Sequence, residues 1–90
     1  MSEFFTSMGP EDAIQLEKLT RLIYELRENR ETILRGYGVS DETALLAQIE
    51  AGTIAEHPSY EHYLSARILS ETRGTVRTML TACLKEVGRA

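Results

Sequence analysis

The chain has few of the residues that build cross-links or membrane spans. Its one cysteine, Cys83, cannot form an internal disulfide, which fits a reducing compartment. Nowhere do about 18 apolar residues follow one another, as a membrane-spanning helix requires. Residues 1–8 have neither the basic start nor the apolar run of a signal peptide. We therefore expect a cytoplasmic protein that does not associate with a membrane.

Motifs that carry catalysis are also missing. There is no glycine-rich phosphate loop, no nucleophile elbow and no second cluster of metal ligands. Cys83 falls on the apolar side of a predicted helix, where a thiol normally behaves as a small, inert hydrophobic side chain. We expect a non-enzymatic protein without a cofactor.

The residues that are present have the composition of one small globular domain. Of 90 residues, 42% are hydrophobic and 27% are charged. A domain of this size buries only somewhat more than about 60% of the surface of its unfolded chain, and self-association is a common way to bury more. The net charge of −4 is uneven, since residues 1–62 carry 12 acidic and 5 basic side chains and residues 63–90 carry 2 and 5. This asymmetry can steer association.

Hydrophobic spacing predicts three helices and no strand. Apolar residues three and four apart predict a helix over about 10–35, which begins with a proline and ends at glycines. Ser40 is the expected N-cap of a short helix over about 41–51. A third helix is expected over about 58–87, again beginning with a proline. A kink near Gly74 stays open, because glycine and threonines lower helix propensity there.

These helix lengths predict an elongated architecture. The first and third helices would be roughly 39 and 45 Å long, whereas a compact domain of this size has a radius of gyration of about 12 Å. We predict a single all-α domain, a long antiparallel helical hairpin with a short middle helix, preceded by flexible residues 1–9. Because such a hairpin leaves apolar surface uncovered, we expect two copies to dimerise into a four-helix bundle.

Both histidines lie close together, which raises the question of a metal site. His57, Glu61 and His62 are residue types that bind first-row metals. His57 and His62 are five residues apart, however, and therefore about 140° apart around a helix. No further histidine completes a site. We expect structural roles for these residues and keep a metal-handling accessory protein as an alternative.

Two tyrosines of the same segment are stronger candidates for recognition. Tyr60 and Tyr63 lie three residues apart, and Arg67 follows Tyr63 by one turn, so that its guanidinium can stack on the ring. The alternative is that both rings close the end of the bundle.

Basic residues recur at multiples of four in the third helix. Arg73, Arg77, Lys85 and Arg89 form what we call the basic row, in which Thr81 takes the remaining position. Such a row can meet the carboxylates of a protein or the phosphates of a nucleic acid, or it can simply be solvated. An isoelectric point near 5.1 argues against nucleic acid.

Arg30 occupies a position of the first helix where the pattern calls for an apolar residue. A charge on such a seam can fix register or oligomeric state by pairing with a carboxylate, for which we expect Glu71 or a carboxylate of a second subunit. The alternative is that the Arg30 side chain extends to water.

Together these patterns favour a non-enzymatic protein–protein interaction or regulatory module that acts as a homodimer and binds an unidentified protein partner. A small nucleic-acid-associated regulator that uses the basic row, and the metal-handling accessory protein, are the alternatives.

Overall fold

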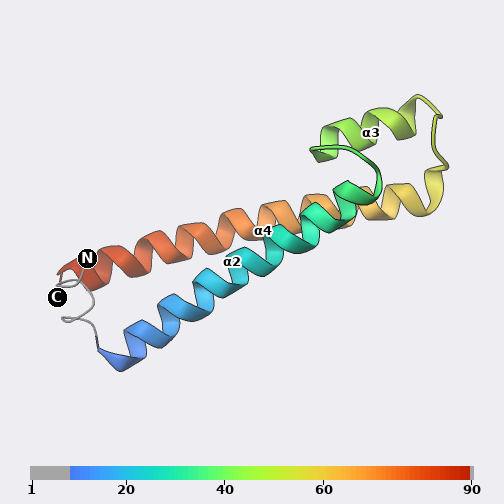
Figure 1. The fold of residues 1–90 in the computed structure, drawn as a ribbon. Coiled ribbons are helices and arrows are strands. Elements are labelled where there is room, and N and C mark those ends of the chain that lie inside the picture. The colour runs from blue at the N-terminus through green and yellow to red at the C-terminus, as the bar shows by residue number, and fades with distance from the viewer. Residues whose placement is uncertain (1–8, 90) are drawn as a thin grey trace.

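The computed structural model describes residues 9–89, and these form three α-helices and no strand (Figure 1). Helix α2 spans Pro10–Gly36, α3 spans Glu42–Glu50 and α4 spans Glu56–Arg89. The two long helices run antiparallel along each other, and α3 lies at the end where the chain reverses (Figure 1). The all-α hairpin with a short middle helix is confirmed.

Local sequence signals explain where the first long helix begins and ends. Pro10 takes the first helical position of α2, directly after Gly9, whose backbone is extended. The chain leaves α2 through Gly38, whose φ of 68° favours glycine. The segment expected to be flexible, residues 1–9, lies outside the described residues except for Gly9.

The short helix α3 is capped by Asp41 and not by the predicted Ser40. Asp41 has an extended backbone, and its Oδ1 accepts a hydrogen bond of 2.8 Å from the backbone N–H of Ala44. Ser40 is one residue too early to reach the free N–H groups of the first turn. Gly52, with a φ of 74°, follows the helix.

Helix α4 is continuous through its middle. His57 has extended dihedral angles (φ −113°, ψ 133°), so the regular part begins at Pro58. No other residue of α4 departs from helical dihedral angles, and the helix passes through Gly74 without a break.

The long helices pack along a seam with alternating spacings of three and four, which is the spacing of antiparallel coiled coils. Every residue of this seam is buried or half-buried. In α2 the seam consists of Leu16, Leu19, Ile23, Leu26, Arg30 and Ile33, and in α4 of Ala66, Leu69, Arg73, Val76, Leu80, Cys83 and Val87.

The best-buried cluster lies under α3. Leu45 is fully buried and packs with Leu34 of α2 and Ala66 of α4. Away from α3 the molecule is only two helices thick (Figure 1). The whole molecule has extents of 55 × 18 × 17 Å. Its radius of gyration of 17.7 Å exceeds the value of about 12 Å for a compact domain of this length. None of the described helices is both long and apolar enough to cross a membrane.

Candidate functional site

A polar layer interrupts the apolar seam beside α3. The Arg30 guanidinium donates hydrogen bonds to both carboxylate oxygens of Glu42, with a distance of 2.9 Å between Nη2 and Oε2. The two side chains are 17% and 18% exposed. The expected pairing of Arg30 with Glu71 is wrong, because Glu71 accepts instead from Arg67, one turn earlier on the same helix. The first turn of α3 supplies the carboxylate that Arg30 needs.

The charges of this layer stabilise each other. The hydrogen bond from Arg30 lowers the pKa of Glu42 below its usual range; burial opposes this effect, and the nearby charge of Arg73 adds to it. The same hydrogen bond raises the pKa of Arg30. Glu42 is therefore ionised at neutral pH, and the ion pair ties α3 to the seam of the hairpin.

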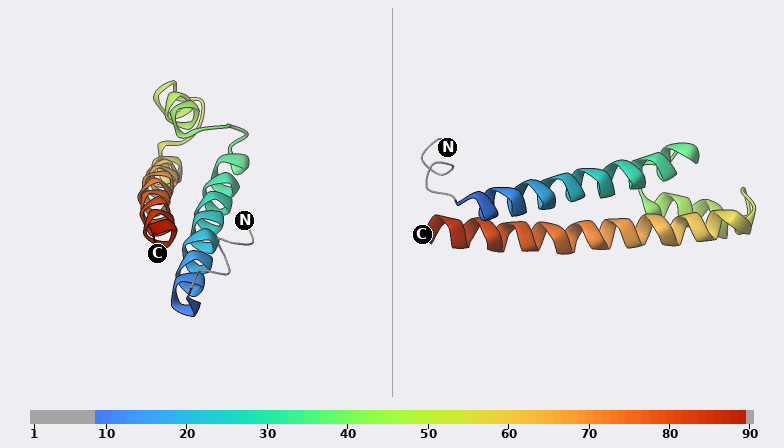
Figure 2. Two further views of the ribbon diagram at one scale, coloured as in Figure 1. Left: turned by 90° about the vertical axis from the view of Figure 1, so that its left-hand side faces the viewer. Right: turned by 90° about the horizontal axis from the view of Figure 1, so that it is seen from below.

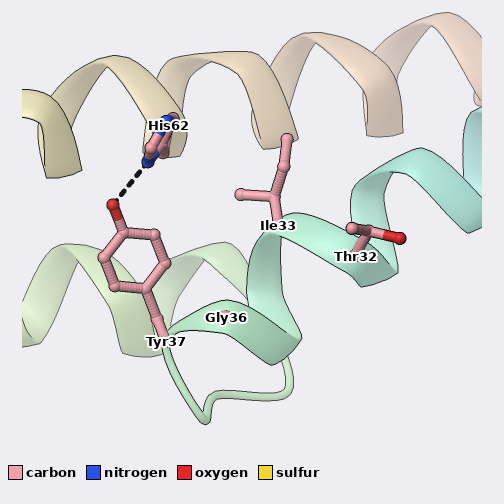
Figure 3. A pocket seen from close by; sticks show the side chains of 5 residues that line it. All are labelled: Thr32, Ile33, Gly36, Tyr37 and His62. Carbon is pink, nitrogen blue, oxygen red and sulfur yellow. Dashed lines mark hydrogen bonds between the residues drawn. The ribbon is translucent and has the colours of Figure 1, made fainter.

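The two histidines point to different partners. Nδ1 of His57 lies 2.6 Å from Oε1 of Glu61, in an exposed contact that lowers the pKa of the Glu61 carboxyl. His62 instead faces the end of α2, where its Nδ1 shares a hydrogen bond with the hydroxyl of Tyr37 (Figure 3). Among residues 9–89, no three His, Cys, Asp or Glu side chains are placed to share a metal ion.

Tyr37 is a site residue that the sequence patterns did not single out. Its ring meets the His62 ring edge-on, with 5.7 Å between centroids. Together with Thr32, Ile33 and Gly36, the two rings line an open pocket of about 410 Å³ (Figure 3). The spacing of the seam could have indicated Tyr37 from the sequence, because Tyr37 follows the seam residue Ile33 by four residues, just beyond the helix.

The two tyrosines of α4 differ in burial. The Tyr60 and Tyr63 rings stack, with centroids 5.9 Å apart. Tyr63 also packs against the buried cluster under α3, whereas Tyr60 is 39% exposed. The Arg67 guanidinium, expected to stack on Tyr63, donates to Glu71 at 3.0 Å.

The basic row does not stay on one face. Arg73 turns toward the seam and is half-buried, while Lys85 is exposed. With Arg27 of α2, Arg73 and Arg77 line a groove of about 460 Å³ between the long helices, which we call the arginine groove. Its remaining lining residues are Thr20, Ile23, Leu80 and Thr81. The side chain of Arg89 lies outside the described part of the chain.

The middle of the opposite side of the hairpin has a stretch without charged residues. Along the edge of the seam, each long helix has a row of residues spaced four, three and four apart, and the row of α2 shares Leu26 and Ile33 with the seam. The row of α2 is Leu22, Leu26, Asn29 and Ile33, and the row of α4 is Ile68, Thr72, Thr75 and Met79. We call these eight residues the uncharged face.

Helix geometry places both rows on one side. At about 100° per residue, Leu22 and Arg27 lie on opposite flanks of the seam residue Ile23. Met79 and Arg77 likewise lie on opposite flanks of the seam of α4. Because Arg27 and Arg77 line the same groove, the other two flanks lie together on the far side of the hairpin.

The uncharged face is open to solvent over much of its length. Ile68 is 60% exposed, Met79 49% and Leu22 40%. Helix α3 does not cover the uncharged face, because α3 lies on the side of the arginine groove. There the charge of Arg73 contributes to lowering the pKa of Glu42 in α3. The end-on view in Figure 2 shows α3 over one side of the α2–α4 pair.

These features define a small all-α protein built on an antiparallel helical hairpin, with an uncharged face and an arginine groove on opposite sides. The chain belongs to the Uncharacterized protein MJ0235 family, whose sequence model matches residues 6–88. The match includes α2, α3 and all but the last residue of α4. No curated protein and no solved structure is significantly similar to the chain.

Proposed function

We propose that the protein is a non-enzymatic interaction module that acts as a homodimer, in which the uncharged faces of two copies pack together as a four-helix bundle. The observation that carries this proposal is the partly exposed, charge-free surface over residues 22–33 of α2 and 68–79 of α4. Large apolar side chains such as Ile68 and Met79 gain free energy when they leave water.

The chemistry of the face favours a second copy as its partner. In a two-fold symmetric dimer each surface patch meets an identical patch, so any charge near the axis meets a like charge. The uncharged face avoids this repulsion. Its rows, spaced four, three and four, also suit the packing of helices at small crossing angles in a four-helix bundle.

Matched charge insertions test the proposal. Ile68→Asp places a carboxylate in the uncharged face, whereas Ile14→Asp places one at a similarly exposed isoleucine (60% against 53%). Ile14 lies about 160° around α2 from the buried Leu16 and therefore away from the seam, and it lies two turns before Leu22 and about 80° around the helix from it.

Light scattering coupled to size-exclusion chromatography reports the outcome, with circular dichroism to confirm that each variant is helical. We expect Ile68→Asp to be monomeric at concentrations where the wild type and Ile14→Asp are dimeric. If both variants keep the mass of the wild type, or both lose it equally, the uncharged face is not the interface.

A further inference from the structure

We propose that the arginine groove binds an organic phosphate, with its phosphoryl oxygens held by Arg73 and Arg77 and its apolar part lying on Ile23 and Leu80. This site lies on the side of the hairpin opposite the uncharged face and does not depend on dimerisation.

The groove collects cationic groups from two helices. Arg27 comes from α2, and Arg73 and Arg77 come from successive turns of α4. A guanidinium presents five N–H donors in a planar fork, which matches two oxygens of a phosphate at once. The volume of about 460 Å³ lies within the range of about 300–1,000 Å³ typical of small-ligand sites.

These cations form no ion pair across the groove, although the Glu42 carboxylate is near enough to Arg73 for that charge to lower its pKa. Within residues 9–89, no carboxylate lies within ion-pair distance of the Arg73 or Arg77 guanidinium. Arg27 has only Glu28 at 3.8 Å, on its own helix. Three neighbouring positive charges repel one another, and a bound anion removes this repulsion. Such a groove is unexpected in a chain with a net charge of −4.

The threonines and apolar residues that line the arginine groove restrict the kinds of ligand that it can bind. The hydroxyls of Thr20 and Thr81 donate to backbone carbonyls of their own helices, at 2.8 and 3.0 Å. The arginines are therefore the donors available to a ligand. Ile23 and Leu80 are half-buried apolar side chains that line the same groove, so the groove suits a molecule that combines an anionic group with an apolar or ring portion.

The same geometry argues against an extended nucleic acid. Each step of four residues along the basic row turns by about 40° around the helix, so that Lys85 lies about 120° from Arg73. Arg73 and Arg77 face the groove, whereas Lys85 is exposed and does not line it. A backbone of many phosphates would need a continuous basic surface.

Calorimetric titration with pyrophosphate and with ADP at low salt tests the site. Arg77→Gln removes a groove cation, and Arg67→Gln makes the same change in charge at a residue that pairs with Glu71 and does not line the groove. We expect ADP to bind more tightly than pyrophosphate. We also expect Arg77→Gln to weaken both ligands at least tenfold and Arg67→Gln to change either affinity less than twofold.

Several results would overturn the assignment. Equal weakening by both variants would mean diffuse attraction without a site, and absence of binding by both probes would remove the site. Equal affinity for the two probes would remove the contribution of Ile23 and Leu80. Binding to duplex DNA that is weakened equally by Arg77→Gln and Lys85→Gln would favour a nucleic-acid surface instead. Ile68→Asp should bind ADP like the wild type, so that failure of this site is distinguishable from failure of the dimer.

Discussion

The ion pair between Arg30 and Glu42 should be one of the strongest side-chain interactions in the hairpin. It joins the seam of α2 to the first turn of α3 through two charge-assisted hydrogen bonds. We expect its removal to destabilise the fold measurably, and a double-mutant cycle with Arg30→Met and Glu42→Gln isolates the pairwise contribution.

The burial of the two side chains sets the magnitude that we expect for the coupling free energy between Arg30 and Glu42. With 17% and 18% of their side chains exposed, Arg30 and Glu42 lie between two limits. Exposed ion pairs contribute about 0.2–1 kcal/mol, and breaking a fully buried pair costs about 3–5 kcal/mol. A coupling free energy of about 2 kcal/mol follows, which corresponds to roughly a 30-fold change in the unfolding equilibrium constant.

Urea unfolding, followed by far-ultraviolet circular dichroism at neutral pH, measures the four free energies of the cycle. The protomer concentration must be the same in every sample, because unfolding of an oligomer depends on concentration. The exposed pair of Arg67 and Glu71, 58% and 64% exposed, serves as the matched control cycle, with an expected coupling of about 0.3–0.5 kcal/mol.

The reasoning would be refuted if the two cycles gave the same coupling. That result would mean that the polar layer is solvated in solution and that α3 is held by Leu45 and its apolar neighbours alone.

Two further predictions concern pH and backbone conformation. Because the folded state lowers the pKa of Glu42, its stabilising contribution is complete above the ordinary glutamate pKa of about 4.3 and is lost as the pH falls through the lowered value. The stability difference between the wild type and Glu42→Gln should therefore be constant at neutral and mildly acidic pH and shrink in acid; a difference unchanged in strong acid would contradict the assignment. Gly52→Ala should destabilise the protein by about 1 kcal/mol, because the φ of 74° strains any side chain. Gly74→Ala should stabilise it by about 0.5–1 kcal/mol, since Gly74 is helical and an added Cβ meets open space. Thermal unfolding of both glycine variants measures these opposite shifts, and shifts of the same sign would contradict the left-handed conformation of Gly52 or the helical one of Gly74.

The sequence predicted the helices well because their signals are local. Apolar residues three and four apart mark the buried side of each long helix, and Pro10 and Pro58 mark where the regular helices begin. Such signals do not depend on distant parts of the chain. The hairpin followed from helix length and from the glycines between the helices.

The partners of single side chains were not predictable in the same way. Arg30 was recognised as an unusual seam residue, but its pairing with Glu42 depends on how residues 37–41 return the short helix over the seam. The contact between Tyr37 and His62 has the same cause, since these residues are 25 positions apart and meet only in the folded hairpin.

The basic row shows a different limit of sequence patterns. A spacing of four looks like one helix face, but each step of four residues advances by about 40° around the helix. Over the row this rotation carries Arg73 into the groove and leaves Lys85 outside it. Arg27 completes the groove from α2, and no pattern within α4 indicates it.

The most direct test of the proposed dimer is the mass of the wild-type protein in solution. Sedimentation equilibrium over a range of micromolar concentrations should give twice the chain mass of 10.2 kDa. A mass of 10.2 kDa at the highest concentration, with the helical content intact, would contradict the proposal that the uncharged face binds a second copy.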